Sequence, residues 1–282
     1  MQAGCLRSNC GPEKHMNDRI FVDGVLKGKV AFITGGGTGI TGGVARAFAE
    51  AGANVALVSR KLEHLEPAAQ AINDARAANP NVGEAFPVVA DVRNFEQIEE
   101  ALVASVVRFG KIDIVVNGAA GNFLVPAEQL SPNGFGTVVD IDLKGTFNVC
   151  RTAFAQLKEH QGQILNISAT LHYLGTPMQL HVSAAKAGVD ALTRNLAVEW
   201  GRYGIRVNGI APGPIEDTEG MKRLVPEPIK EKLRKNIPLG RFGRISDIET
   251  AAVFLCSDAA NFINGAVLVV DGGQWLSAAR MV

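Results

Sequence analysis

The chain has 282 residues, and its 28 Lys and Arg balance 28 Asp and Glu, so its formal net charge at pH 7 is zero. It has no basic cluster of the kind that binds nucleic acid, and no apolar run approaches the roughly 18 residues that span a bilayer. We therefore expect a soluble protein that acts on a small ligand, with no nucleic-acid partner and no membrane insertion.

The sequence favours one domain over residues 24–282 after a loose N-terminal arm over residues 1–23. The arm has no hydrophobic periodicity and no apolar core of a secretory signal. Its Cys5 and Cys10, together with Cys150 and Cys256, show no C-x-x-C spacing and no metal-like partnering with the five histidines. We expect free thiols in a reducing compartment and no metal site.

From Lys29 onwards, short β-branched runs alternate with segments long enough for a helix. This alternation is typical of a parallel sheet with helical crossovers, and right-handed crossovers put helices on both of its faces. The prediction is an α/β, doubly wound (Rossmann-type) fold, in which ligands bind beyond the carboxyl ends of the strands. Seven strands are expected, over residues 30–34, 54–59, 84–90, 112–117, 163–168, 205–211 and 266–270.

The first strand runs into a glycine-rich turn and then into a helix. Such a turn presents backbone N–H groups and the positive end of a helix dipole to an anion, although an ordinary surface loop can also be rich in glycine. We expect a phosphate group to be bound by Gly35, Gly36, Gly37, Thr38, Gly39 and Ile40.

Residues after the next strands suggest which cofactor carries that phosphate. Ser59 and Arg60 follow the second strand, where an arginine suits a 2′-phosphate and an acidic residue would suit a free 2′-hydroxyl. This favours NADP(H), with a solvated arginine at a helix start as the alternative. Asp91 can accept from an adenine amino group or cap the helix that starts near Asn94. Asn117 can brace neighbouring strands.

Six motifs, in their order and spacing, resemble those of the short-chain dehydrogenase/reductases. The resemblance covers residues 24–273 and implies further cofactor contacts from Val92, Asn117, Lys186, Pro212, Gly213 and Ile215. The motifs are TGGGTGI at 34–40, NGAAGNF at 117–123, DIDLKG at 140–145, NIS at 166–168, SAAKAGVDAL at 183–192 and APGPI at 211–215.

The chain departs from the usual pattern of that family at the catalytic acid and in the glycine turn. Most members have a catalytic tyrosine four residues before the lysine, where this chain has Val182. Tyr173 is the tyrosine closest to Lys186 in the chain and is an alternative acid, although its place does not match the family position. Thr41 stands where the glycine turn usually has a third glycine, so the packing of the turn is expected to differ there or to rely on Gly42.

In lacking this tyrosine, the chain resembles one branch of the family, the 2,4-dienoyl-CoA reductases, especially the peroxisomal type. That branch shares Asp142 in place of asparagine, His181 five residues before the lysine, and the GAVLVVDGG segment at 265–273. The resemblance implies that NADPH reduces the conjugated diene of an acyl-CoA. Asp142 and Lys186 would then handle the proton through an ordered water, and Ser168 would stabilise the dienolate. Asp142 can alternatively be a paired carboxylate on a helix.

The same resemblance implies a substrate site. Its members are Arg60, Arg93 and Arg223 for the phosphates, Phe123, Ser131, Pro132 and Asn133 for the acyl side, and His181. Each arginine is equally plausible as a surface charge, and His181 as a packed or capping residue. Residues 216–236 are expected to form a lid, with a plain pair of surface helices as the alternative.

One helix and the C-terminal residues bear on the assembly and the compartment of the protein. The apolar positions of the helix over 182–200 are wider than one buried stripe, and the resemblance implies a homotetramer. We expect a cytoplasmic protein, with the peroxisome as the alternative, because the C-terminal residues 279–282 resemble a peroxisomal address only if the final valine is ignored. Alternative functions are a 2-enoyl-CoA or 3-oxoacyl reductase, or a non-catalytic nucleotide-binding scaffold or sensor.

Overall fold

The computed structural model describes residues 21–225 and 227–279. Most of the expected N-terminal arm, with Cys5 and Cys10, and the C-terminal residues 280–282 therefore lie outside the described residues. No helix in the described part of the chain is long and apolar enough to cross a membrane.

The described chain builds one sheet of seven parallel strands in the order β3-β2-β1-β4-β5-β6-β7. The prediction of a doubly wound, seven-stranded parallel sheet is confirmed, and the strand ends differ from the expected ones by at most two residues. The strands are β1 (Val30–Thr34), β2 (Asn54–Ser59), β3 (Ala85–Val89), β4 (Ile114–Asn117), β5 (Gln163–Ile167), β6 (Arg206–Pro212) and β7 (Val267–Val270).

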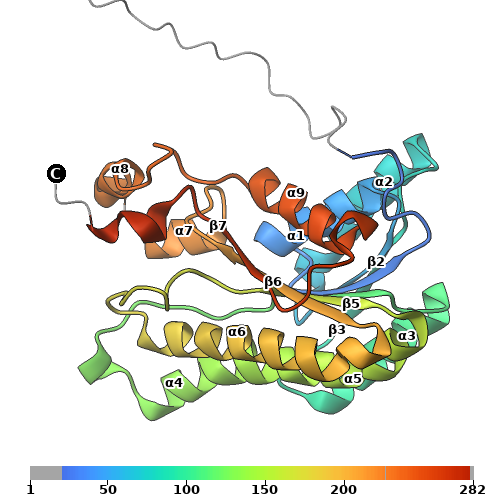
Figure 1. Ribbon diagram of the computed structural model, residues 1–282, viewed down its shortest axis with the longest axis horizontal. Coiled ribbons are helices and arrows are strands. Elements are labelled where there is room, and N and C mark those ends of the chain that lie inside the picture. Colours follow the sequence, from blue (N-terminus) through green and yellow to red (C-terminus); the bar gives the residue numbers. More distant parts are fainter. Residues whose placement is uncertain (1–20, 226, 280–282) are drawn as a thin grey trace, which may run out of the picture.

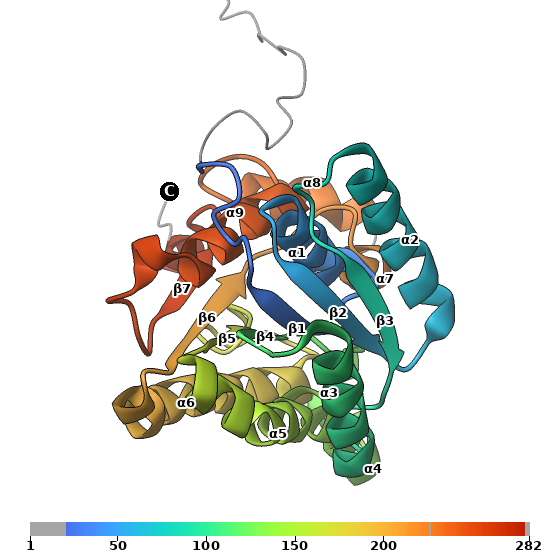
Figure 2. The same ribbon diagram turned by 90° about the vertical axis from the view of Figure 1, so that its right-hand side faces the viewer.

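Helices cover both faces of this sheet (Figures 1 and 2). One face packs on α1 (Gly39–Glu50), α2 (Leu62–Ala78) and α9 (Ile245–Cys256), and the other on α3 (Phe95–Phe109), α5 (Gly145–His160) and α6 (Leu180–Trp200). The alternation of side chains along a strand explains the two cores. Ile33 of β1 belongs to the core under α1, whereas its neighbour Phe32 belongs to the core under α5.

Shorter elements carry much of the candidate site. Helix α4 (Pro132–Val139) continues into α5 through a wider, π-helical turn at Asp140–Lys144, which contains Asp142, and such turns are frequent at functional sites. Helices α7 (Glu219–Leu224) and α8 (Glu227–Lys235) follow β6 within the segment expected to be a lid. The remaining short elements of the described chain are 3-10 helices at Ala127–Gln129, Gly201–Tyr203, Asp258–Ala260 and Gln274–Ala279.

Candidate active site

The glycine turn lies between β1 and α1 at the point where the strand order reverses, which is where doubly wound sheets bind ligands. Gly35 and Gly39 have φ values of +71° and +58°, and a Cβ atom on Gly35 would lie 2.8 Å from the carbonyl oxygen of Gly118. Only glycine fits such a backbone without strain. The N-cap residue Thr38 makes no side-chain hydrogen bond to the first turn of α1, so the N–H groups of that turn have no such partner. The turn therefore fits a phosphate group.

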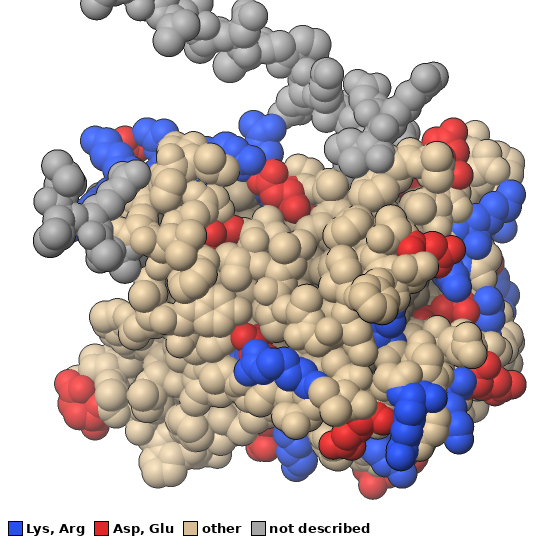
Figure 3. Space-filling view, viewed as in Figure 1, with Lys and Arg blue, Asp and Glu red and all other residues tan. Residues whose placement is uncertain are grey.

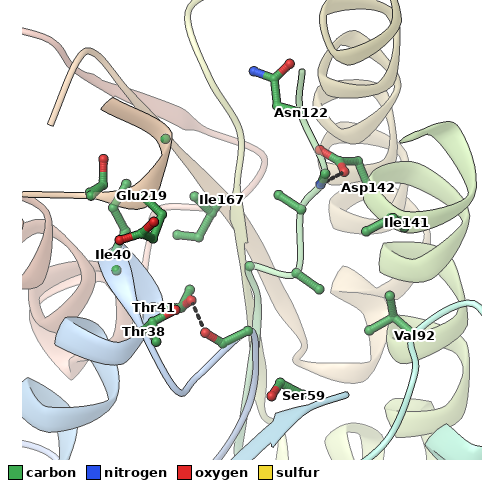
Figure 4. A pocket seen from close by; sticks show the side chains of 18 of the residues that line it. Thr38, Ile40, Thr41, Ser59, Val92, Asn122, Ile141, Asp142, Ile167 and Glu219 are labelled. Atoms are coloured by element: carbon green, nitrogen blue, oxygen red, sulfur yellow. Dashed lines mark hydrogen bonds between the residues drawn. The ribbon is translucent and has the colours of Figure 1, made fainter. Parts of the chain in front are cut away.

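Thr41 braces the turn that was expected to need a third glycine there. Its hydroxyl donates to the Gly35 carbonyl oxygen at 2.7 Å (Figure 4). Its methyl group fills the space over Gly118, where an added Cβ atom would lie only 2.0 Å from it. The close packing at this point thus comes from a glycine on the β4 side, and the threonine is compatible with the turn.

A cavity of about 600 Å³ opens beyond the carboxyl ends of the strands. In Figure 4, Thr38 and Ile40 lie on one side of it, and Ile141 and Asp142 on the other. It brings together most residues predicted to bind the cofactor or to act on substrate. They are Gly35, Gly37, Thr38, Gly39, Ile40, Ser59, Arg60, Asp91, Val92, Asp142, Ser168, Lys186, Pro212, Gly213 and Arg223.

A second cavity, of about 650 Å³, adjoins the first and has a mainly apolar wall. Leu174, Met221, Leu233 and Trp275 supply much of its wall, and Ile215 lines it as well. The two cavities share eight lining residues and therefore border on each other, so a ligand in one can contact a ligand in the other at these residues. The shared residues are Ile40, Asn122, Ala169, Leu171, Pro212, Gly213, Thr218 and Gly220.

Asp142 and Lys186 form a buried ion pair in the wall of the first cavity. The Asp142 side chain is 0% exposed, and its Oδ2 lies 3.3 Å from Lys186 Nζ. Asp142 Oδ1 accepts from the Gly121 N–H at 2.7 Å, and Lys186 Nζ donates to the Ile167 carbonyl oxygen at 2.9 Å. Oδ2 accepts no hydrogen bond within the described residues. Because buried carboxylate oxygens are rarely left unpaired, this atom suits a bound water or a substrate group.

Ser168 and Tyr173 both direct their hydroxyl groups at Asp190 of α6. Ser168 Oγ donates to Asp190 Oδ1 at 2.5 Å, and Tyr173 Oη donates to Asp190 Oδ2 at 3.2 Å. Burial raises the pKa of Tyr173 to about 12, and the Asp190 carboxylate adds to this shift. Tyr173 lines neither cavity. The geometry therefore does not favour Tyr173 as the acid. The only hydroxyl proton of Ser168 is already donated to Asp190.

The residues predicted for the acyl side do not line either cavity. Phe123 instead stacks on His181, with ring centroids 4.3 Å apart, and His181 is fully buried. Burial lowers the pKa of His181, and the nearby Asp142 carboxylate opposes that shift. Ser131 caps α4 by accepting from the Gly134 N–H at 3.0 Å, and Pro132 and Asn133 form the exposed first turn of that helix.

The three arginines occupy different surroundings. Arg60 lines the first cavity. Arg93 forms a two-pronged ion pair with Asp91, and this contact lowers the pKa of the Asp91 carboxyl group. Arg223 of α7 reaches across the cavity mouth and donates to the Asn122 carbonyl oxygen at 3.3 Å. Arg60 and Arg223 therefore both line the first cavity, whereas Arg93 is tied to a neighbouring carboxylate.

Two structural alternatives are decided by hydrogen bonds. Asn94, and not Asp91, caps α3 by accepting from the Gln97 N–H at 3.0 Å. Asn117 braces β4 against β5 through its amide, which donates to Asn166 Oδ1 at 2.8 Å, as predicted. Asn117, like Gly36, does not line the first cavity.

Asn122 is a polar residue of this site that the sequence interpretation missed. It lines both cavities, and its Oδ1 is buried without a hydrogen-bond partner in the described residues. Its Nδ2 donates to Gln179 Oε1 at 2.8 Å. Amide oxygen and nitrogen positions are interchangeable, so in either orientation one polar atom of Asn122 stays unpaired. The signal in the sequence was a single polar side chain in the otherwise small-residue loop after β4.

A family model described as enoyl-(acyl carrier protein) reductase matches residues 35–274. The chain belongs to the short-chain dehydrogenase/reductase family. The chain is therefore an oxidoreductase of an NAD(P)-dependent family.

Two curated relatives are similar to almost the whole of this short-chain dehydrogenase/reductase. A peroxisomal 2,4-dienoyl-CoA reductase of Arabidopsis thaliana, which produces the (3E)-enoyl-CoA, is 48% identical and aligns over 93% of this chain and 90% of its own length. The enzyme of the same description from Saccharomyces cerevisiae is 50% identical, over 89% and 85%. A gluconate 5-dehydrogenase from Burkholderia cenocepacia, solved with NADP and tartrate, is 33% identical with a TM-score of 0.80, over 88% and 95%.

Proposed function

We propose that this chain uses NADPH to reduce the conjugated double bonds of 2,4-dienoyl-CoA thioesters to an enoyl-CoA, an auxiliary step in the β-oxidation of unsaturated fatty acids. The observation that carries the proposal is the buried Asp142–Lys186 pair, beside a Val182 that is buried and apolar where the family usually has its acid. Reduction of a conjugated C=C ends with a proton on carbon. It forms no alkoxide, so it does not need the acid that protonates the alkoxide in carbonyl reduction. The names of the curated relatives support the same substrate class.

The residues of this chain would divide the reaction between them. NADPH, when bound along the glycine turn, supplies a hydride to C5 of the dienoyl group. Negative charge then spreads onto the thioester oxygen. Asp142 Oδ2 and Lys186 Nζ hold a water from which C2 takes its proton, which leaves a double bond between C3 and C4. Because Asp142 and Lys186 are buried, the local dielectric constant is low, and this strengthens the interaction of each charge with the water.

The thioester oxygen needs a hydrogen-bond donor in the wall that the two cavities share. Ser168 and Asn122 are the two candidates that we propose. Ser168 would have to turn its hydroxyl proton away from Asp190, whereas Asn122 Nδ2 carries a second N–H besides the one that it donates to Gln179. The second cavity would then hold the acyl chain among its apolar side chains.

Cations and a closing segment would hold the rest of the CoA thioester. We propose that Arg60, Arg93 and Arg223 bind its phosphates, and that His181 and Phe123, with residues 131–133, form the outer substrate wall after rearrangement. The Arg223 contact with Asn122 supports a lid role for residues 216–236, because it joins α7 to the loop after β4 across the cavity. Opening of this contact would admit substrate.

Arg60 is expected to set the preference for NADPH. In the Arg60→Ala variant the KM for NADPH should rise by about 10- to 100-fold, since charge-assisted hydrogen bonds contribute roughly 1.5–3 kcal/mol. The KM for NADH should change little, because NADH has no 2′-phosphate. Steady-state kinetics with both cofactors on one preparation makes NADH the internal control. An equal rise in both KM values would show that Arg60 does not read the 2′-phosphate.

The proposed substrate class can be separated from its rivals by one panel of assays. NADPH oxidation is followed with 2,4-hexadienoyl-CoA, crotonyl-CoA and acetoacetyl-CoA. Oxidation with 2,4-hexadienoyl-CoA alone is expected. Turnover of crotonyl-CoA or acetoacetyl-CoA in its place would point to a 2-enoyl-CoA or 3-oxoacyl reductase, and no turnover with any of them to a nucleotide-binding scaffold or sensor.

We also propose that the chain forms a homotetramer. Val198 of α6 is 83% exposed, and Phe147 of α5, Phe262, Leu268 and Leu276 are exposed apolar side chains as well. Figure 3 shows a broad surface with few charged side chains on the side where β7 and α6 lie (Figure 1). Light scattering at micromolar concentration is expected to give about four times the 29.8 kDa of one chain. A monomer at that concentration would contradict the proposal.

The compartment is inferred from the relatives. Both curated relatives described above are peroxisomal enzymes, which supports the peroxisomal alternative over the cytoplasm for this chain. We infer that the protein works in the peroxisome or in an equivalent reducing compartment. Cys150 and Cys256 are consistent with such a place, since both are free, buried thiols whose pKa burial raises to about 12.

A further inference from the structure

The carboxylate of Asp190 collects three donors from one loop. Asp190 lies on α6, one turn beyond Lys186, and is only 2% exposed. Its Oδ1 accepts from Ser168, and its Oδ2 contacts His172 Nε2 at 2.8 Å and the Tyr173 hydroxyl at 3.2 Å. A buried carboxylate with this many donors is a strong local anchor, because its charge is satisfied where it lies.

These donors lie in a loop, residues 168–176, that forms most of the irregular segment 168–179 between β5 and α6. Its other side chains face the ligand cavities. Ala169 and Leu171 line both cavities, and Thr170, Leu174 and Thr176 line the apolar one. The loop therefore has one side that Asp190 holds and another that forms the wall against which an acyl chain would lie.

Asp190 is the main polar anchor of this loop. Within the described residues, the hydrogen bonds that tie residues 169–176 to another element end on Asp190. The other bonds of the segment stay inside it, as in the Thr176 hydroxyl that donates to the Leu171 carbonyl oxygen at 3.0 Å. Without Asp190, residues 169–176 would keep no hydrogen bond to another element among the described residues. The segment would be tied only at its ends, where Ser168 N–H donates to the Ile210 carbonyl oxygen at 2.7 Å and Val125 N–H donates to the Met178 carbonyl oxygen at 3.1 Å.

The anchor also reaches a second segment of the wall of the apolar cavity. The Tyr173 ring packs edge-on against Trp275, with centroids 5.5 Å apart, and also against His172 at 4.4 Å. Trp275 lines the apolar cavity together with Leu174. A shift of Tyr173 would therefore move two parts of the cavity wall at once.

We propose that Asp190 is a positioning residue that sets the shape of the acyl cavity and hence the preference for acyl-chain length. This inference rests on the proposed function, since it assigns the apolar cavity to the acyl chain. A short dienoyl chain needs only the wall shared by the two cavities, where Ala169 and Leu171 lie beside Asn122. A long chain also contacts Leu174 and Trp275, whose positions depend on Asp190.

The test compares Asp190→Asn with wild type, because asparagine keeps the shape but offers one acceptor oxygen to three donors. The KM for 2,4-decadienoyl-CoA should rise by about tenfold, whereas the KM for 2,4-hexadienoyl-CoA and both kcat values should change by less than about threefold, since disorder in two or three wall side chains weakens binding by such factors. The control is Asp74→Asn, the same change at an exposed site on α2. It should leave both KM values unchanged.

A second readout does not depend on activity. Amide hydrogen exchange over residues 169–178 should be at least about tenfold faster in Asp190→Asn than in Asp74→Asn. If Asp190→Asn does not fold, Tyr173→Phe removes one donor, keeps the ring on Trp275 and should shift the decadienoyl KM in the same direction by less. A folded Asp190→Asn with an unchanged ratio of the two KM values, or with unchanged exchange, would overturn the proposal. If the wild type does not oxidise NADPH with either thioester, the proposed function fails, and exchange alone decides whether Asp190 anchors the loop.

Discussion

Replacement of Asp142 by Asn is expected to lower kcat for 2,4-hexadienoyl-CoA by about 100- to 1,000-fold, because general acid–base groups contribute factors of this size. Asparagine can still accept the Gly121 N–H, so the loop after β4 keeps its anchor. What the variant loses is the carboxylate charge beside Lys186 Nζ, and with it the group that orients the proton-donating water. Lys186→Ala is expected to lose at least as much, since the lysine is also predicted to grip the cofactor.

The matched control is Asp140→Asn, the same change two residues earlier at an exposed position in the same wide turn. It should keep near wild-type kcat. Loss of one partner of a buried ion pair typically destabilises a protein by about 3–5 kcal/mol, so the Tm of each variant and its binding of NADPH must be measured alongside. A folded, NADPH-binding Asp142→Asn variant with near wild-type kcat would contradict the assignment.

Asn122→Ala is expected to lower kcat by about 100-fold, the usual effect of removing one donor to a developing oxyanion. Ser168→Ala should cost only about threefold, because the Ser168 hydroxyl already donates to Asp190 and its loss frees no donor in the shared wall. The KM of each variant for the dienoyl-CoA should stay within a few-fold of wild type, since the thioester oxygen is more negative in the transition state than in the substrate.

Gln179→Ala provides the control for the Asn122 variant. It removes the partner of the Asn122 amide but not the amide itself, so its effect on kcat should be clearly smaller. The opposite ranking, in which Ser168→Ala loses more activity than Asn122→Ala, would make Ser168 the donor. In that case its hydroxyl turns away from Asp190 when substrate binds.

The sheet could be predicted almost to the residue because its signal is local. Runs such as Ile114–Asn117 and Val267–Val270 are apolar and β-branched, and a parallel strand covered on both faces needs little else. The glycine turn was equally readable, since left-handed φ values at Gly35 and Gly39 leave few other residues that fit. The effect of Thr41 was not readable, because it depends on a glycine 77 positions away, at Gly118.

Side-chain pairings across the site were less accessible to sequence. Asp142 and Lys186 were paired through a resemblance, and the structure brings the two charges together. The hydroxyl of Ser168, by contrast, donates to Asp190. This contact joins the residue after β5 to α6, and the periodicity of the sequence gives no sign of it. Phe123 and His181 lie against each other and outside both cavities. The sequence does not distinguish the two roles, because an aromatic ring and an imidazole can pack on each other as readily as they can line a ligand site.

In the proposed reaction, hydride and proton are both delivered to carbon, at the two ends of the diene. The direct test is isotopic labelling of the product of 2,4-hexadienoyl-CoA, once with cofactor deuterated at the transferred position and once with ordinary NADPH in D₂O. We predict cofactor-derived deuterium at C5, solvent-derived deuterium at C2 and a double bond between C3 and C4. Deuterium from the cofactor at C1 or C3, or solvent deuterium that does not reach C2, would contradict the account.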